Sequence, residues 1–269
     1  IDWNRIINSL LILLTISIFL FPGSQMQFAQ DKSPKYQIDF NEINGELTSK
    51  DLYKKEFGRY DGYKIELYAG EAVNCIVYSN SFQPSLALVN SKGEIVKQSD
   101  KNSNGYANIS VIIPASDNWV LYVIGDEKSV GKYTLQTSVA EPNSLTISDD
   151  ADFCSKMEFL LAHSIAYFSF IDNPSLTKQQ LVKFPESVDV FIDEEDGGYK
   201  SVFYDDNDLS KAESIFKNLN DKIKNCLGSE WQISPAKWQR LDDYKEKSVV
   251  FEEKSKDKQR AVKLSLLDY

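Results

Sequence analysis

The sequence contains a single histidine, His163, and this scarcity limits the catalytic sites that it can build. A zinc site takes three or four ligands, which a lone exposed histidine cannot supply. On the helix predicted around it, His163 lies two residues from both Leu161 and Ile165 and should face solvent, and it is too far from Cys154 for a catalytic dyad. The chain also lacks a glycine-rich phosphate loop, a Gly-x-Ser-x-Gly motif and a Cys-x-x-Cys pair. We therefore predict no catalytic residues, no metal site and no cofactor, and we expect that the protein is not an enzyme.

Basic residues are also few, because 30 lysines and arginines stand against 40 acidic residues and leave a formal charge of −10. A surface of this charge repels a phosphate backbone and an anionic membrane alike, so we expect no nucleic-acid partner. The chain is long and apolar enough for a sizeable core, with 269 residues of which 42% are hydrophobic.

The N-terminal segment 1–29 is predicted to be a signal peptide that lies outside the folded domains. Arg5 precedes an uncharged apolar run, Leu10–Phe21, which is too short to span a bilayer comfortably but suits a signal-peptide core. Cleavage after Ala29 would make the protein secreted or periplasmic, and its partner would then be an unknown protein or polysaccharide outside the cytoplasm. The alternative is an uncleaved membrane anchor, and only in that case do we expect contact with a membrane.

Short strand patterns recur over residues 45–139, after a polar lead-in over 30–44. In the stretch Asp61–Leu88, apolar and polar residues alternate on both sides of the turn Ala69–Glu71, as in two half-buried strands. No helical period intervenes before about residue 140. We therefore predict an all-β sandwich, jelly-roll-like, with strands near 63–68, 72–79, 85–90, 94–99, 107–113, 119–125 and 132–139. Cys75 shares a strand face with Val73 and Val77 and should be a buried thiol.

From about Ile43 to Val139 the sequence resembles the pre-peptidase C-terminal domain, a β-sandwich module attached to many secreted bacterial peptidases. The resemblance rests on the order of short motifs: Gly45–Leu47, Asp61–Tyr63, Ala69–Glu71, Ser81–Leu88, Gly93, Asp100, Pro114–Ser116 and Gly131–Leu135. It implies an accessory module for binding, secretion or solubility, without catalysis of its own. Some related sandwiches bind calcium through acidic loops. Here Gln83 replaces the usual aspartate and Asp100 alone cannot provide six to eight oxygens, so calcium is only an alternative.

A change of hydrophobic period from two to 3.6 across segment 140–151 indicates a linker between two domains. The second domain, 152–269, is predicted to contain a helix over 152–171, a hairpin over 187–204, a helix over 208–227 and a second hairpin from strands 248–252 and 261–267. We expect an α+β domain of order α-β-β-α-β-β, with both helices on one face of an antiparallel sheet.

This order resembles a small α/β module of secreted bacterial proteins, without a named activity, that has one cysteine early in its first helix and another at the end of its second. Cys154 and Cys226 match these places, and antiparallel packing of the helices would bring them together. We therefore predict a Cys154–Cys226 disulfide, with two separate buried thiols as the alternative.

Three aromatic residues in a loop-like stretch, Trp231, Trp238 and Tyr244, are the candidate ligand contacts of the second domain, although core packing would also explain them. The acidic runs Asp193–Asp196 and Asp205–Asp208 lack the spacing of a calcium loop and are interpreted as a solvated turn and a helix cap. We predict a secreted, non-enzymatic binding or interaction protein. The alternative is an extracellular hydrolase or hydrolase regulator, whose site would gather two carboxylates beside Trp231 or Trp238.

Overall fold

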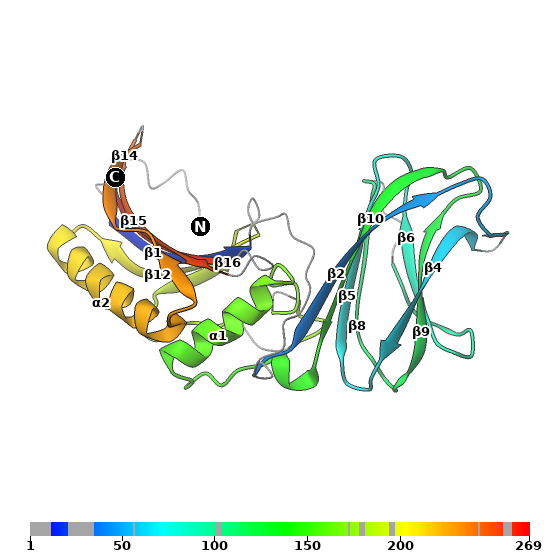
Figure 1. Cartoon of the computed structure of the whole chain (residues 1–269), viewed down its shortest axis with the longest axis horizontal. Helices are drawn as coiled ribbons and strands as arrows, with labels where there is room; N and C mark the ends of the chain where they lie inside the picture. Colours follow the sequence, from blue (N-terminus) through cyan, green and yellow to red (C-terminus); the bar gives the residue numbers. More distant parts are fainter. Residues whose placement is uncertain are drawn as a thin grey trace. The chain divides into compact units, whose positions relative to one another are not determined.

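The computed structural model describes residues 12–20, 35–55, 57–99, 104–171, 173–177, 181–193, 197–241, 243–254 and 260–269. They form two compact units (Figure 1). One unit is Ser33–Leu145 with Asn173–Lys178, and the other joins the N-terminal segment to Thr146–Asp172 and Gln179–Tyr269. The change of unit after Leu145 falls within the segment 140–151, where the sequence places a linker.

The first unit is a sandwich of two antiparallel sheets. The four-stranded sheet has the order β2-β10-β5-β8, from strands Ile38–Leu47, Gly131–Ala140, Ala72–Tyr78 and Tyr106–Ile112. The five-stranded sheet has the order β3-β4-β9-β6-β7, from strands Tyr53–Lys54, Gly58–Leu67, Asp117–Gly125, Ser85–Val89 and Ile95–Gln98. β2 pairs with β10, β4 with β9, β5 with β8 and β6 with β7, which is the strand pairing of a jelly roll. The unit is thus the all-β sandwich that the alternating pattern predicts.

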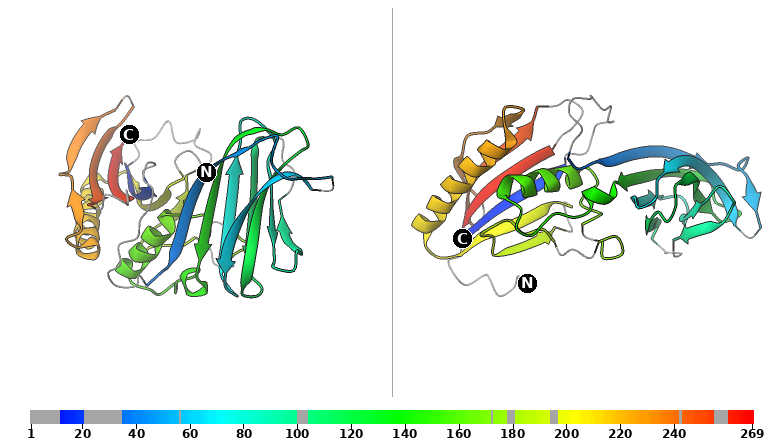
Figure 2. Two further views of the ribbon diagram at one scale, coloured as in Figure 1. Left: turned by 45° about the vertical axis from the view of Figure 1, so that its right-hand side comes forward. Right: turned by 90° about the horizontal axis from the view of Figure 1, so that it is seen from below.

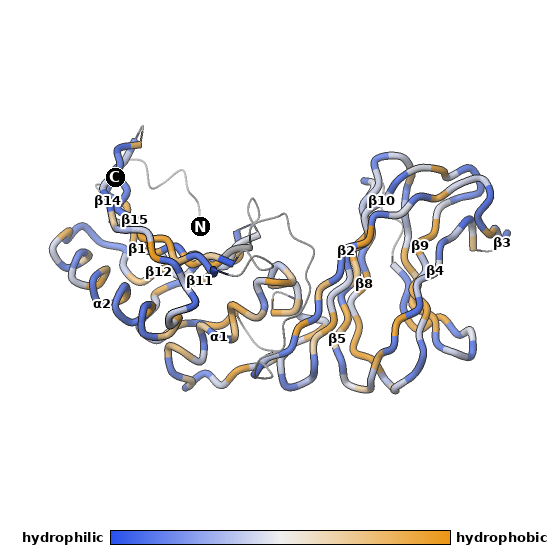
Figure 3. The backbone as a smooth tube through the Cα atoms, viewed as in Figure 1, coloured by the Kyte–Doolittle hydropathy of each residue, from blue (hydrophilic) through white to orange (hydrophobic). Residues whose placement is uncertain are grey.

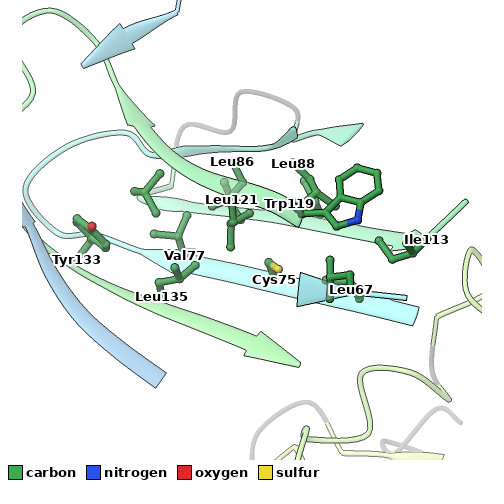
Figure 4. Close-up of a cluster of buried hydrophobic side chains, with 14 of the residues drawn as sticks. Leu67, Cys75, Val77, Leu86, Leu88, Ile113, Trp119, Leu121, Tyr133 and Leu135 are labelled. Carbon is green, nitrogen blue, oxygen red and sulfur yellow. The ribbon is translucent and has the colours of Figure 1, made fainter. Parts of the chain in front are cut away.

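Hydrophobic and hydrophilic residues are interspersed along the strands of this unit (Figure 3). The buried apolar residues form a core between the two sheets. Leu67, Cys75, Leu86, Trp119 and Leu135 each expose 2% of their surface or less, and they meet from both sheets (Figure 4). Burial raises the pKa of the Cys75 thiol to about 12, so the thiol stays protonated at neutral pH.

The segment 30–44 is not only a polar lead-in, because β2 begins at Ile38. β2 pairs only with β10 and is therefore an edge strand of the sheet. Asp39, Asn41 and Glu42 are exposed on it. An edge strand tolerates such polar residues, and they obscure the period of two in the sequence.

The second unit is built on one antiparallel sheet of order β11-β12-β1-β16-β15-β13, with β14 also paired to β15. Its strands are Ile12–Leu20 (β1), Asp189–Ile192 (β11), Tyr199–Asp206 (β12), Trp231–Ile233 (β13), Lys237–Arg240 (β14), Lys245–Glu253 (β15) and Arg260–Asp268 (β16). The predicted order α-β-β-α-β-β therefore lacks two short strands, β13 and β14, as well as β1. β13 pairs with residues 251–253 of β15, and β14 pairs with residues 245–248. The sequence predicts β15 only as one strand of a hairpin.

The prediction that the whole segment 1–29 lies outside the folded domains is wrong, because β1 is part of the sheet. It lies between β12 and β16 and pairs antiparallel with both. Leu14, Ile16 and Ile18 are fully buried in this position. An uncharged apolar run is typical of a central strand as well as of a signal-peptide core, because both are shielded from water.

Both helices lie on one face of this sheet (Figures 1 and 2). α1, Phe153–Ser164, begins at the cap Asp152 and stops short of the predicted end at 171. Its continuation is prevented because Tyr167 and Phe168 have left-handed backbone conformations, with φ of 50° and 57°. α2, Leu209–Leu227, has the predicted cap Asp208 at its start and Gly228 after its end.

Cys154 and Cys226 form a disulfide between α1 and α2, with their Cα atoms 5.0 Å apart. The pairing expected from the sequence is therefore present, and Cys75 is the remaining free cysteine. Neither helix in the described ranges combines the length and the apolar composition needed to cross a bilayer.

Candidate functional site

An open hollow of about 780 Å³ lies at one end of the four-stranded sheet of the sandwich. Its walls come from three neighbouring strands, β2, β10 and β5, and from the loop that follows β5. The lining residues are Asn44, Gly45, Glu46, Tyr78, Ser79, Asn80, Ser81, Lys132, Tyr133 and Thr134. Small-ligand sites commonly have volumes of about 300–1,000 Å³, so we take this hollow as the candidate functional site.

A row of aromatic and polar side chains crosses the sheet at the hollow. Tyr106 on β8 lies opposite Tyr78 on β5 in the strand register. Thr134 on β10 in turn lies opposite both Tyr78 and Asn44. Directly opposite residues of antiparallel strands share a face, and here it is the outer face, since Tyr78 exposes 45% of its surface. Neighbouring strands are about 4.8 Å apart, so the row is about 14 Å long.

Ser79 fixes the loop that forms one wall of the hollow. Its hydroxyl donates a hydrogen bond to the carbonyl of Lys132 at 2.9 Å and accepts from the backbone N–H groups of Ser81 and Phe82. Its own N–H donates to the carbonyl of Gly105, where a Cβ atom would stand 2.2 Å from the Ser79 carbonyl oxygen. The wall is therefore held in place by hydrogen bonds before any ligand arrives.

Tyr133, which lines the hollow, belongs to a partly buried group of polar side chains. Its hydroxyl donates to the Asp61 carboxylate at 2.6 Å and lies 2.5 Å from the hydroxyl of Tyr63. Burial is the main cause that raises the pKa of both phenols, and the negative charge of Asp61 adds to the effect. Both tyrosines therefore remain neutral at physiological pH and act as hydrogen-bonding groups rather than as bases.

The exposed part of the lining combines an aromatic ring with polar groups whose charges balance. Thr134 donates to the side-chain oxygen of Asn44 at 2.9 Å. The amide nitrogens of Asn44 and Asn80 and the ammonium of Lys132 have no hydrogen-bond partner within the described part of the chain. Lys132 lies opposite Glu46 in the register, so the lining has one group of each charge. Such a surface can hold an uncharged polar ligand by stacking and hydrogen bonding.

The structure does not bring the candidate aromatics Trp231, Trp238 and Tyr244 together. Trp231 is 9% exposed on β13, and Trp238 is 41% exposed on β14. Their partner positions on β15 are residues 253 and 247, which lie about 20 Å apart along an extended strand. Tyr244 packs on the ring of Tyr269, with centroids 5.0 Å apart.

Two carboxylates, Glu253 and Glu213, lie at the positions opposite these tryptophans or pair with them, and each is engaged by a cation. Glu253, opposite Trp231, accepts two hydrogen bonds from Arg260, at 2.7 and 2.6 Å. Lys247, opposite Trp238, is paired with Glu213 at 3.4 Å. The alternative hydrolytic site would need two carboxylates facing one substrate, and the acids beside these aromatics are instead in ion pairs.

His163 is buried, which corrects the prediction that it faces solvent. α1 is apolar around most of its circumference, so the side opposite the Leu161 stripe is covered as well. His163 packs against Phe159 and Phe170, with ring centroids 4.3 and 6.2 Å away. Cys154 is consumed by its disulfide and is not available as a nucleophile.

The acidic runs are placed only in part. Asp208 caps α2 by accepting a hydrogen bond from the N–H of Lys211 at 3.0 Å, as expected for the second run. Residues 194–196 of the first run, and Asp100, lie outside the described residues. Among the residues that the structure describes, no three His, Cys, Asp or Glu side chains are grouped as metal ligands.

Comparisons with known proteins give structural likenesses only. No family model matches the chain, and no curated protein matches it. The periplasmic inhibitor of g-type lysozyme PliG from Aeromonas hydrophila is similar over 42% of this chain and 92% of its own, at 14% identity and a TM-score of 0.31. The pre-peptidase C-terminal domain of a collagenase from Bacillus anthracis is similar over 36% of this chain and 87% of its own, at 14% identity and a TM-score of 0.29. The likeness is confined to β-rich architecture.

Proposed function

We propose that the protein is an exported, non-enzymatic binding protein whose sandwich binds a neutral polysaccharide in the hollow beside Tyr78. One observation carries this proposal: the exposed Tyr78 ring borders a hollow lined by amides and hydroxyls on adjacent strands, together with one group of each charge, Glu46 and Lys132. The C–H face of a sugar ring packs well on an aromatic ring, while its hydroxyls require both donors and acceptors. Tyr78 supplies the ring, and Asn44, Asn80 and Thr134 supply the polar groups.

Charge supports a neutral ligand over an anionic one. The chain carries a formal charge of −10, and Lys132 in the hollow is offset by Glu46. An anionic polymer would meet no excess of positive charge at this surface. Tyr106, which lies opposite Tyr78 and is not part of the lining, extends the contact beyond the hollow, which favours a polymer over a single small molecule.

Location outside the cytoplasm is part of the same proposal. The disulfide between Cys154 and Cys226 is stable in an oxidising compartment and is rare in the cytosol. Extracellular polysaccharide is abundant in such a compartment, and a binding protein needs no reactive group to recognise it.

The test is affinity gel electrophoresis of the full chain through gels that contain neutral glucan, mannan or galactan. We expect at least one of these polymers to retard the protein, and Tyr78→Ala to weaken the interaction by about tenfold or more, as for other anchoring aromatics. Tyr53→Ala is the matched control, because Tyr53 is similarly exposed, at 42%, but lies on the other sheet. Absence of retardation by all three polymers, or equal retardation of the Tyr78→Ala protein, would refute the proposal.

A further inference from the structure

β1 is a central strand in the sheet of the second unit. If it were absent, its two neighbours could not replace it by pairing with each other in the same register. β12 matches β1 at seven residues and β16 matches it at nine, and both pair with it antiparallel. β12 and β16 are therefore parallel to each other, on opposite sides of β1. We call the position between them the strand slot. If β1 left, a row of backbone N–H and C=O groups on each flanking strand would lose its hydrogen-bond partners.

The side chains of β1 define what the slot accepts. Leu14, Ile16 and Ile18 have no exposed surface and share one face of the strand. Thr15 and Ser17, which alternate with them, expose only 8% and 9%. The slot therefore takes aliphatic side chains at every second position, small hydroxyl side chains between them, and no charge.

The helices over the slot are held together independently of β1. α1 and α2 both contact β1, and α2 also contacts β12 and β16 on either side of it. The Cys154–Cys226 disulfide ties the two helices to each other. Removal of β1 would therefore leave an apolar site with a covalently fixed cover, and the strands on both sides would remain attached to α2.

We propose that the strand slot is an acceptor site for an extended apolar segment of a partner protein, and that β1 occupies it only until residues 1–29 are removed. The sequence provides the reason for exchange, since β1 lies inside the apolar run Leu10–Phe21 that has the character of a signal-peptide core. Removal of residues 1–29 on export empties the slot. The partner strand enters antiparallel to both neighbours and restores the backbone ladder, as in other cases where a peptide adds a strand to a sheet. This inference rests on the export proposed above, but not on the binding function of the sandwich.

The experiment uses the full chain with a specific protease site inserted within residues 21–34. The protein is cut, and a fluorescent peptide of residues 10–21 with a solubilising lysine tail is added. Fluorescence anisotropy and size-exclusion chromatography measure its uptake. The matched control peptides carry Ile16→Asp, which places a charge at a fully buried position, and Thr15→Ser, which keeps the chemistry of that position.

We expect the wild-type and Thr15→Ser peptides to enter the cut protein and the Ile16→Asp peptide to bind at least 100-fold more weakly. Two results would overturn the proposal. In the first, the cut protein keeps its own N-terminal fragment and takes up no peptide. In the second, it loses the fragment, binds no peptide and melts at an unchanged temperature. If loss of the fragment causes aggregation, refolding with the peptide decides: recovery of soluble protein supports the strand slot, and failure refutes it.

Discussion

The ring of Tyr133 lies over Gly45 on the neighbouring strand, where a Cβ atom would stand 2.3 Å from the ring carbon Cζ. β10 and β2 can pair at this point only because residue 45 has no side chain. The same placement brings the Tyr133 hydroxyl to Asp61, and Tyr133 is also one of the residues that line the hollow.

Gly45→Ala should destabilise the sandwich by about 1–3 kcal/mol, because the new methyl group overlaps the Tyr133 ring. Urea unfolding followed by tyrosine and tryptophan fluorescence measures the loss. The double variant Gly45→Ala/Tyr133→Leu is the control, since it removes the ring that the methyl group meets. If Gly45→Ala costs as much in the Tyr133→Leu background as in the native one, the contact is not the cause.

Loss of the Cys154–Cys226 disulfide should destabilise the second unit by about 4 kcal/mol in the chain-entropy model, given the separation of 72 residues that it closes. The double variant Cys154→Ser/Cys226→Ser tests this by thermal unfolding. Cys75→Ala is the control and should keep the bridge intact in a non-reduced digest.

The native Cys75 thiol, with its pKa raised to about 12 by burial, should resist iodoacetamide at pH 8 until the protein is unfolded. A digest in which Cys75 is bridged would contradict the assignment.

Lys156 is 4% exposed, and its ammonium donates hydrogen bonds of 2.7 Å to the carbonyls of Asp149 and Lys183. Lys156→Met keeps most of the apolar stem but leaves both carbonyls without this donor. We expect a loss of roughly 2–4 kcal/mol in the free energy of unfolding, measured by urea denaturation. Lys217→Met, at an exposed position of α2, should change it little. An equal effect of the two variants would show that the buried ammonium has no special role.

Alkaline pH should destabilise the sandwich through Tyr63 and Tyr133. Their pKa values are raised in the folded protein, chiefly by burial, from an ordinary value of 10.0. The unfolded chain therefore loses these protons first, so stability is fully present below about pH 9 and declines as the pH rises above 10. Melting temperatures between pH 8 and pH 11.5 should show this decline, and it should be shallower in Tyr133→Phe. A constant melting temperature over this range would contradict the burial of the phenols.

The sandwich can be predicted from sequence because most of its strands bury one face and therefore alternate clearly, as in Val73, Cys75 and Val77. β2 escapes prediction because an edge strand with a single partner keeps polar residues such as Asp39 and Glu42. β1 resembles a signal-peptide core because a strand buried on both faces carries no charge, and an uncharged apolar run of this length suits either role. The prediction for His163 is wrong for a related reason: a helix that is covered on most sides has no solvent face for its period to reveal.

The hollow cannot be predicted, because its residues come from strands that are distant in sequence. Asn44, Tyr78 and Thr134 become neighbours only through the pairing of β2 and β5 with β10. The one local signal is the outward position of Tyr78 at the end of a strand that is apolar except for Asn74. Trp231 and Trp238, which are close in sequence, are instead separated because they pair with different parts of β15. Sequence proximity is therefore a poor guide to the site.

The pairing of β1 with β16 has a consequence for synthesis of the protein. The last residue of β1 is Leu20 and the first of β16 is Arg260, so 240 residues must be translated before these two strands can meet. At about 5–20 residues per second, this takes roughly 12–50 s. During that interval the apolar run of β1 has no completed sheet to enter. Formation of the central strand pair of this sheet therefore waits for the C-terminal end of the chain.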